Sequence, residues 1–346
     1  MLSAATLIGG FIIDYLTLRR VDFLFDNLLI VLYLIFTGVS IFIVNLYEAG
    51  KLRTKFVGSI YEFLPFLLQF SFGGLFSAFV VFYSKSASLF TSGAFVLILL
   101  TLLIGNEFFK ERYSKLVFQV VIFFVALFSF SIYFLPVVLR QMSVAVFLWS
   151  GALSLGLVGV FIFVISRFAP HRYKESEKRL IVAILAVYAI INILYFTNII
   201  PPIPLSFKGG DVYHRVERRE DGNYLVTGEA DVWQEKFNLG QTVHLVAGEP
   251  VYVLSSVFAP TDLNIKIVHN WQYLDEEKVR WKSASKISFP IRGGRDEGYR
   301  GFSSKANVFP GHWRVDIETD RGQVIGRIRF DIEMVDVVQN LEAEVI

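Results

Sequence analysis

The first residues that could do chemistry form a charged cluster near the N-terminus, between two apolar runs. It comprises Asp14, Arg19, Arg20, Asp22, Asp26 and Asn27. Ionisable groups beside membrane-length apolar runs are costly, which makes them functional candidates. A carboxylate pair there could bind a cation or act on a lipid-linked substrate. The alternative is an interfacial helical hairpin whose charges pair or lie at headgroup depth.

A second group lies in a glycine-rich stretch from Arg292 to Gly301. Its candidate ligand-binding residues are Arg292, Arg295, Asp296, Tyr299 and Arg300. Arginine forks could bind the carboxylates or phosphates of an anion or sugar. The alternative is a long hairpin in which glycines supply positive φ angles and the charges pair locally.

Most catalytic chemistry has no support in the sequence. The chain has no cysteine, which excludes thiolate metal sites and cysteine nucleophiles. We find no Ser/His/Asp constellation or nucleotide fingerprint, and His214, His244 and His312 lack metal-ligand spacing. The net charge of +2 gives no basic excess for nucleic acid. We therefore predict no catalytic residue, metal, cofactor or nucleic-acid partner.

The composition divides the chain near Pro201. Of its 346 residues, 54% are hydrophobic and only 18% charged, and the mean hydropathy is +0.53. Residues 1–200 carry 15 basic and 9 acidic side chains, whereas residues 201–346 carry 18 and 22. The two parts therefore have formal charges of +6 and −4. We predict a membrane domain over 1–200 and a soluble domain over 201–346.

The membrane domain is predicted to be a bundle of about seven transmembrane helices, because about 20 apolar residues are needed to cross a bilayer. Six runs fit well: Phe23–Leu46, Phe63–Tyr83, Leu89–Phe108, Leu116–Leu139, Val144–Phe168 and Leu180–Ile200. Leu2–Leu16 is a shorter seventh span, for which a cleaved signal peptide is the alternative.

Basic residues favour one orientation of this bundle. Alternate connections hold 11 Lys and Arg on one side and 4 on the other. Because basic loops stay cytoplasmic, we predict a bacterial inner-membrane protein with a cytoplasmic N-terminus. The domain after Pro201 would then be extracytoplasmic.

That domain is predicted to be an antiparallel, immunoglobulin-like β-sandwich. Apolar and polar residues alternate over 263–273, 312–318 and 327–333, and 320–322 reads as a hairpin turn. The alternation places His269 on an apolar face, where a buried structural role is the favoured interpretation.

The same region resembles a bacterial family, domain of unknown function 2914. The resemblance rests on the His269-x-Trp271 strand, the Arg300-Gly301 stretch leading to Lys305, the Gly311-x-Trp313 strand and the turn at Gly322. It covers about 251–333. The resemblance implies a bacterial membrane protein with a small β domain, but it supplies no catalytic residue. We interpret the matching residues as structural.

Two hypotheses follow. In the first, the β domain is a non-enzymatic module that binds an envelope glycan or protein, and the helices anchor it in the bilayer. In the second, the chain is a membrane enzyme or transporter that uses the N-terminal Asp/Arg cluster on lipid-linked or envelope substrates. The first is preferred because the β domain lacks catalytic chemistry. The sequence specifies neither a ligand nor an oligomeric state.

Overall fold

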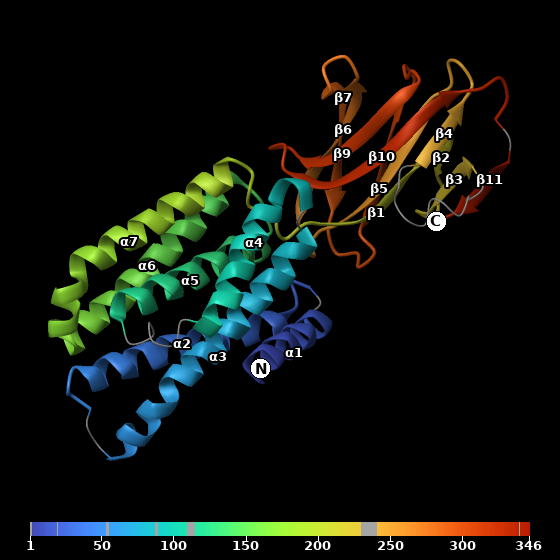
Figure 1. Cartoon of the computed structure of the whole chain (residues 1–346). Coiled ribbons are helices and arrows are strands. Elements are labelled where there is room, and N and C mark those ends of the chain that lie inside the picture. The colour runs from blue at the N-terminus through green and yellow to red at the C-terminus, as the bar shows by residue number, and fades with distance from the viewer. Residues whose placement is uncertain are drawn as a thin grey trace. The chain divides into compact units, whose positions relative to one another are not determined.

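The computed structural model describes residues 2–18, 20–52, 55–86, 89–108, 115–229, 241–338 and 340–346. The chain divides into a helical unit that reaches Pro204 and a β unit from Leu205 to Ile346 (Figure 1). The helices are α1 Leu2–Thr17, α2 Leu24–Glu48, α3 Lys55–Ser86, α4 Leu89–Gly105, α5 Leu116–Leu139, α6 Val144–Phe168 and α7 Pro170–Phe196.

Five of the described helices are long and apolar enough to cross a membrane. They are α2, Phe63–Ser86 of α3, α5, α6 and α7. At 1.5 Å per residue, α1 and α4, with 16 and 17 residues, reach only about 24–26 Å, less than the roughly 30 Å hydrocarbon layer. Among the described residues, five of the roughly seven predicted spans are thus supported by length and composition, and α1 and α4 are shorter.

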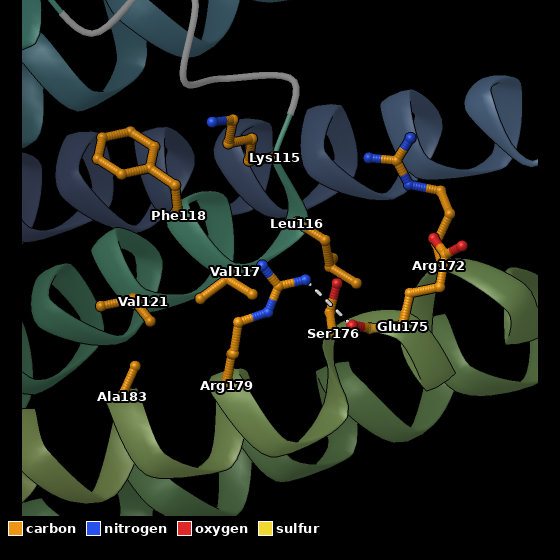
Figure 2. A pocket seen from close by; sticks show the side chains of 10 residues that line it. All are labelled: Lys115, Leu116, Val117, Phe118, Val121, Arg172, Glu175, Ser176, Arg179 and Ala183. Carbon is orange, nitrogen blue, oxygen red and sulfur yellow. Dashed lines mark hydrogen bonds between the residues drawn. The ribbon is translucent and has the colours of Figure 1, made fainter.

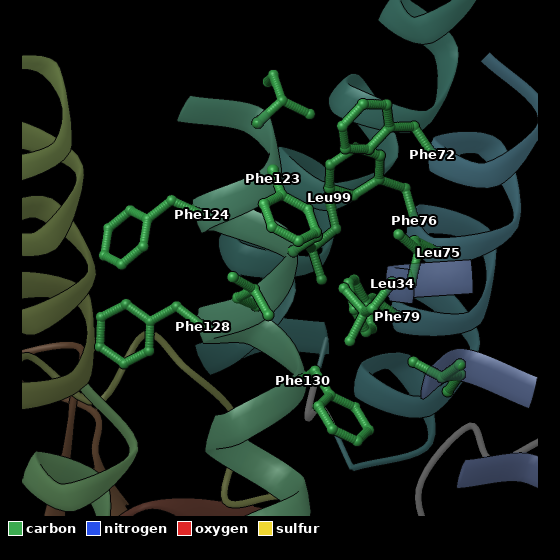
Figure 3. Close-up of a cluster of buried hydrophobic side chains, with 14 of the residues drawn as sticks. Leu34, Phe72, Leu75, Phe76, Phe79, Leu99, Phe123, Phe124, Phe128 and Phe130 are labelled. Atoms are coloured by element: carbon green, nitrogen blue, oxygen red, sulfur yellow. The ribbon is translucent and has the colours of Figure 1, made fainter. Parts of the chain in front are cut away.

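Aromatic side chains fill the centre of the helical unit. Figure 3 shows Phe76 and Phe79 of α3 beside α5, whereas Phe128 of α5 points away from them and stacks on Tyr188 of α7. Tyr133 of α5 packs edge-on against Phe79 and Phe82. Without a hydrophobic driving force between helices in lipid, such packing is a main source of cohesion.

The basic connections converge at one end of this unit. Arg172, at the start of α7, forms an ion pair of 3.3 Å with Glu48 at the end of α2. Lys115, at the start of α5, lines the same cleft as Arg172. At the other end, Lys85 of α3 donates to the Leu18 carbonyl oxygen at 2.7 Å. Among the described residues, Glu48, Lys115 and Arg172 thus share one end of the bundle.

Helix α4 brings the chain back along α3. Its Phe95 packs on Tyr83, near the end of α3, with ring centroids 4.9 Å apart. Asn106, just beyond α4, donates to the carbonyl oxygen of Gln69 at 2.8 Å. Tyr83 meets Phe95 and Gln69 meets Asn106, so the two helices run antiparallel.

The β unit consists of three sheets among the described residues. Its strands are β1 Ser206–Tyr213, β2 Arg215–Arg218, β3 Tyr224–Glu229, β4 Gln241–Leu245, β5 Val251–Phe258, β6 Asn264–Asp275, β7 Arg280–Arg292, β8 Tyr299–Lys305, β9 Gly311–Thr319, β10 Val324–Met334 and β11 Leu341–Val345. The sheet orders are β1-β5-β8, β4-β10-β9-β6-β7 and β11-β3-β2.

This arrangement corrects the prediction that all strands pair antiparallel. Strand β4 pairs parallel with β10, so the five-stranded sheet is mixed rather than antiparallel. The sheets do not show the immunoglobulin-like arrangement that the strand pattern predicted. The alternation itself was interpreted correctly, because Trp271, Val315 and Phe330 all lie on a buried face.

Candidate functional site

One face of the five-stranded sheet is held to the β1-β5-β8 sheet by a buried histidine. His269 is fully buried, and its Nε2 lies 2.8 Å from Ser255 Oγ of β5. Its Nδ1 lies 2.8 Å from Ser303 Oγ of β8, which also accepts from Trp271 Nε1 at 3.0 Å. Burial lowers the pKa of His269 to about 3. A neutral imidazole with both nitrogens engaged connects two sheets and reaches no solvent.

The other residues that carried the family resemblance lie at packing positions and turns. Trp313 is buried and donates to the Phe309 carbonyl oxygen at 2.9 Å, and the Lys305 ammonium lies 6.0 Å from its ring centroid. Gly311 and Gly322 have φ angles of +129° and +78°, values that favour glycine. These positions shape the fold.

The opposite face of the same sheet carries a continuous polar network. Asn270 of β6 donates to Glu318 Oε1 at 2.8 Å and accepts from Ser283 Oγ of β7 at 2.7 Å. Next to it, Gln272 of β6 accepts two hydrogen bonds from Arg314 of β9, at 2.9 and 2.7 Å. The network therefore spans β7, β6 and β9.

The charged groups of this polar network are partly desolvated. Asp316 is 3% exposed and Glu318 is 6% exposed. Burial is the main cause that raises the pKa of Glu318, while the hydrogen bond from Asn270 and the charge of Lys286 oppose it. Glu318 thus lies beneath the longer and more exposed Lys286, whose ammonium is 3.6 Å away.

One basic side chain of this face packs on an aromatic ring. The Arg314 guanidinium carbon lies 4.3 Å from the ring centroid of Trp281 on β7. Lys286 and Arg329 are exposed, and Trp281 is half-buried. Such a surface suits partners with acidic groups and flat apolar faces, because arginine offers planar bidentate donors and tryptophan a stacking face. Alternation predicted a polar face here but did not reveal its hydrogen-bond network.

The glycine-rich stretch is a crossover between sheets. It joins β7 of the five-stranded sheet to β8 of the β1-β5-β8 sheet, so the hairpin interpretation is wrong. Its backbone is anchored by Gly293 N–H to Leu263 O and Gly294 N–H to Ala259 O, at 2.9 and 3.1 Å.

The candidate side chains of this stretch do not form one site. Arg292 pairs with Asp262 at 3.5 Å, and the Arg295 guanidinium lies 5.6 Å from the Tyr299 ring centroid. Asp296 is exposed, and the carbonyl oxygen of Arg300 accepts from the Tyr224 hydroxyl at 3.0 Å. The loop thus has local pairs and an anchored backbone.

The sequence did not predict that two histidines share one carboxylate. His214 Nε2 lies 3.0 Å from Glu229 Oε1, and His244 Nδ1 lies 2.7 Å from Oε2 of the same carboxylate. Burial alone would raise the pKa of Glu229, but hydrogen bonds from His244 and His214 outweigh it and lower the pKa. The described residues contain no group of three His, Asp or Glu that could hold a metal ion.

The N-terminal cluster is divided between separate contacts. Arg20 binds Asp22 through two hydrogen bonds of 2.9 and 2.6 Å. Asn27 donates to the carbonyl oxygens of Val21 and Phe23, at 2.7 and 3.0 Å. Asp14 is half-buried on α1. Arg19 lies outside the described residues.

Asp26 is the most enclosed member of this cluster. It is 4% exposed and accepts weakly from the Arg20 backbone N–H at 3.4 Å. It also interacts electrostatically with the buried Tyr133 of α5, whose hydroxyl has no hydrogen-bond partner among the described residues. The structure therefore brings Asp26 and Asn27 together, with Arg20 and Asp22 as a neighbouring pair.

Comparison with known families now places the β unit. Residues 264–332 match the family model described as "Protein of unknown function (DUF2914)". This segment is a DUF2914 domain. It runs from the start of β6 almost to the end of β10, so it contains His269, Trp271 and the polar face. The DUF2914 domain lies C-terminal to the helical region.

Other comparisons add little. No curated protein matches the chain. Among solved structures, a match is the Pseudomonas fluorescens alkylpurine DNA glycosylase AlkC bound to DNA containing an abasic site analog. It is 10% identical, and the match covers 89% of this chain and 99% of that one, with a TM-score of 0.24. A score this low carries no argument about fold or function.

Proposed function

We infer that the chain is a multi-span membrane protein whose DUF2914 domain binds an acidic partner of the bacterial envelope, without catalysis. The observation that carries this proposal is the polar face built on Asn270, Gln272, Arg314 and Trp281. Hydrogen bonds fix Asn270, Gln272 and Arg314, and Arg314 packs on the Trp281 ring, so a ligand need not order these side chains on binding. Basic and aromatic groups at the outer edge of the network favour an acidic glycan over a neutral one.

The topology assigned to this function is an extracytoplasmic β unit. Lys115, Arg172 and Arg179 lie at one end of the helical unit, and the positive-inside rule assigns such a basic end to the cytoplasm. Protease added to intact spheroplasts should cut within 205–346. Cleavage of this region only in inverted vesicles would overturn the assignment.

The binding proposal is tested with the full-length protein in detergent. Titration with oligosaccharides that contain uronic acid should give saturable binding. Neutral oligosaccharides of equal length should bind at least about tenfold more weakly, which corresponds to roughly 1.4 kcal/mol of binding free energy. Equal binding of both series would contradict an acidic glycan partner.

The second function, transport or chemistry at the N-terminal cluster, is favoured by one observation. Asp26 is a buried carboxylate in a helical unit with membrane-length spans, and such groups mark ion or proton pathways by default. Asp26→Asn should abolish any ion flux of reconstituted vesicles. Equal flux with the variant would exclude Asp26 from that role.

A further inference from the structure

A cleft of about 600 Å³ lies between the start of α5 and the first turns of α7. Its charged lining residues are Lys115, Arg172, Glu175 and Arg179, and apolar lining comes from Leu116, Val117, Phe118, Val121 and Ala183. Figure 2 shows the Arg179 guanidinium extending from α7 toward Leu116 and Val117 of α5. The cleft therefore joins a basic rim to an apolar wall.

The charges of the lining favour an anion. Three basic residues face one acid, and Glu175 also lies 3.5 Å from His171 on its own helix. Arg172 is already paired with Glu48. Arg179 donates to the Glu175 backbone carbonyl at 3.1 Å, but within the described part of the chain neither Lys115 nor Arg179 forms an ion pair.

The depth of the cleft matches a lipid headgroup. Helix α7 has 27 residues, or about 40 Å at 1.5 Å per residue, so it exceeds the roughly 30 Å hydrocarbon layer. Its first ten residues, 170–179, carry the charges, and its apolar stretch begins at Leu180. Lys115 likewise directly precedes the apolar run of α5. The charged ends of α5 and α7 thus both lie where the hydrocarbon layer gives way to the headgroups.

We propose that this cleft binds an anionic phospholipid, with the phosphodiester between Lys115 and Arg179 and an acyl chain along Val117, Val121 and Ala183. Basic pockets between membrane helices on the cytoplasmic side recognise such headgroups. The apolar wall distinguishes a lipid from free phosphate, which would gain nothing from it. This site is independent of the DUF2914 face and of any glycan bound there.

The test compares two double variants of equal charge in the full-length protein. K115A/R179A removes two lining cations, whereas K51A/K178A removes two cations of the same bundle end that do not line the cleft. Native mass spectrometry would follow retention of phosphatidylglycerol and phosphatidylcholine. We expect the wild type to favour phosphatidylglycerol, K115A/R179A to lose about tenfold or more of that affinity, and K51A/K178A to stay within about twofold.

Three results would overturn the proposal: equal losses in the two double variants, equal retention of both lipids, or displacement of phosphatidylglycerol by millimolar inorganic phosphate. Lys115→Gln provides a second variant if the double variant fails to fold. The Lys115 side chain makes no capping hydrogen bond to α5, so its loss should leave the helix intact. An unchanged preference for phosphatidylglycerol in Lys115→Gln would count against the site.

Discussion

Arg327 of β10 donates from both Nε and a terminal nitrogen to the carboxylate of Asp316 on β9, the second bond measuring 2.9 Å. The two residues are direct cross-strand neighbours. Their side chains are 13% and 4% exposed, so the pair is largely shielded from water. This ion pair joins the polar network of β6 and β7 to β10.

Removing one charge of this pair should destabilise the β unit. We expect Asp316→Asn to lower the free energy of unfolding by about 2–4 kcal/mol, because the Arg327 charge would be left shielded and unpaired. Asp331→Asn is the matched control: its carboxylate is 45% exposed, and exposed ion pairs contribute about 0–1 kcal/mol. Urea unfolding of the full-length protein, followed by tryptophan fluorescence, measures both. Equal losses would show that the burial of Asp316 has no energetic effect.

Burial of His269 predicts acid sensitivity. Its pKa is about 3 in the folded protein and about 6.5 when unfolded, so the unfolded chain binds an extra proton between these values. The stability linked to His269 is fully present above pH 6.5 and falls by roughly 1.4 kcal/mol per pH unit toward pH 3.

Unfolding between pH 5 and 6.5 isolates this effect from the Glu229 group, whose contribution is lost only at lower pH because its pKa is lowered. His269→Gln should flatten the slope in this range, while the exposed His312→Gln should keep it. A wild-type slope that survives in His269→Gln would refute the assignment.

Gly301 allows a close approach of an aromatic ring. An added Cβ would lie 2.1 Å from the ring of Phe289, which packs edge-on against His269. Gly301→Ala should cost about 1–3 kcal/mol through overpacking. At Gly228 the closest atom would be 3.3 Å away, on Tyr213, so Gly228→Ala should cost less. Thermal unfolding that ranks the two variants in the reverse order would contradict this reasoning.

Within the helical unit, Asn45 of α2 donates to Gln119 Oε1 of α5 at 2.7 Å, and both residues are fully buried. Asn45→Ala should lower stability in detergent by about 0.5–2 kcal/mol, the scale of such hydrogen bonds between membrane helices. Asn192 donates to the Tyr188 carbonyl of its own helix, so Asn192→Ala serves as the control. A larger loss for Asn192→Ala would argue against the interhelical bond.

Periodicity predicted the elements that depend on local sequence. The alternation in β6, β9 and β10 and the turn at Gly322 follow from residue patterns over a few positions. Such patterns did not predict strand β7 as one continuous element, and its pairing with β6 continues past a bulge. Helix α7 begins at Pro170 rather than Leu180, because charged residues are compatible with a helix beyond the hydrocarbon layer.

Other features depend on contacts that are distant in sequence. The parallel pairing of β4 with β10 joins segments about 90 residues apart, and no local pattern specifies it. His214, between β1 and β2, and His244 of β4 reach one carboxylate only because these segments meet at the end of β3. Similarly, the sequence placed Asn270 and Asp316 on a polar face, but only the strand register makes them members of one network.

The most direct test of the central claim compares charge-matched variants in glycan binding. The double variant Arg329→Gln with Trp281→Ser alters the polar face of the DUF2914 domain. The double variant Arg295→Gln with Tyr299→Ser likewise replaces one arginine and one aromatic residue, but in the β7–β8 connection. Binding of full-length protein to uronic acid oligosaccharides, measured by calorimetry, should weaken at least about tenfold in the first pair and stay near the wild-type value in the second. Loss confined to the second pair, or equal affinity in both, would contradict binding at the sheet face.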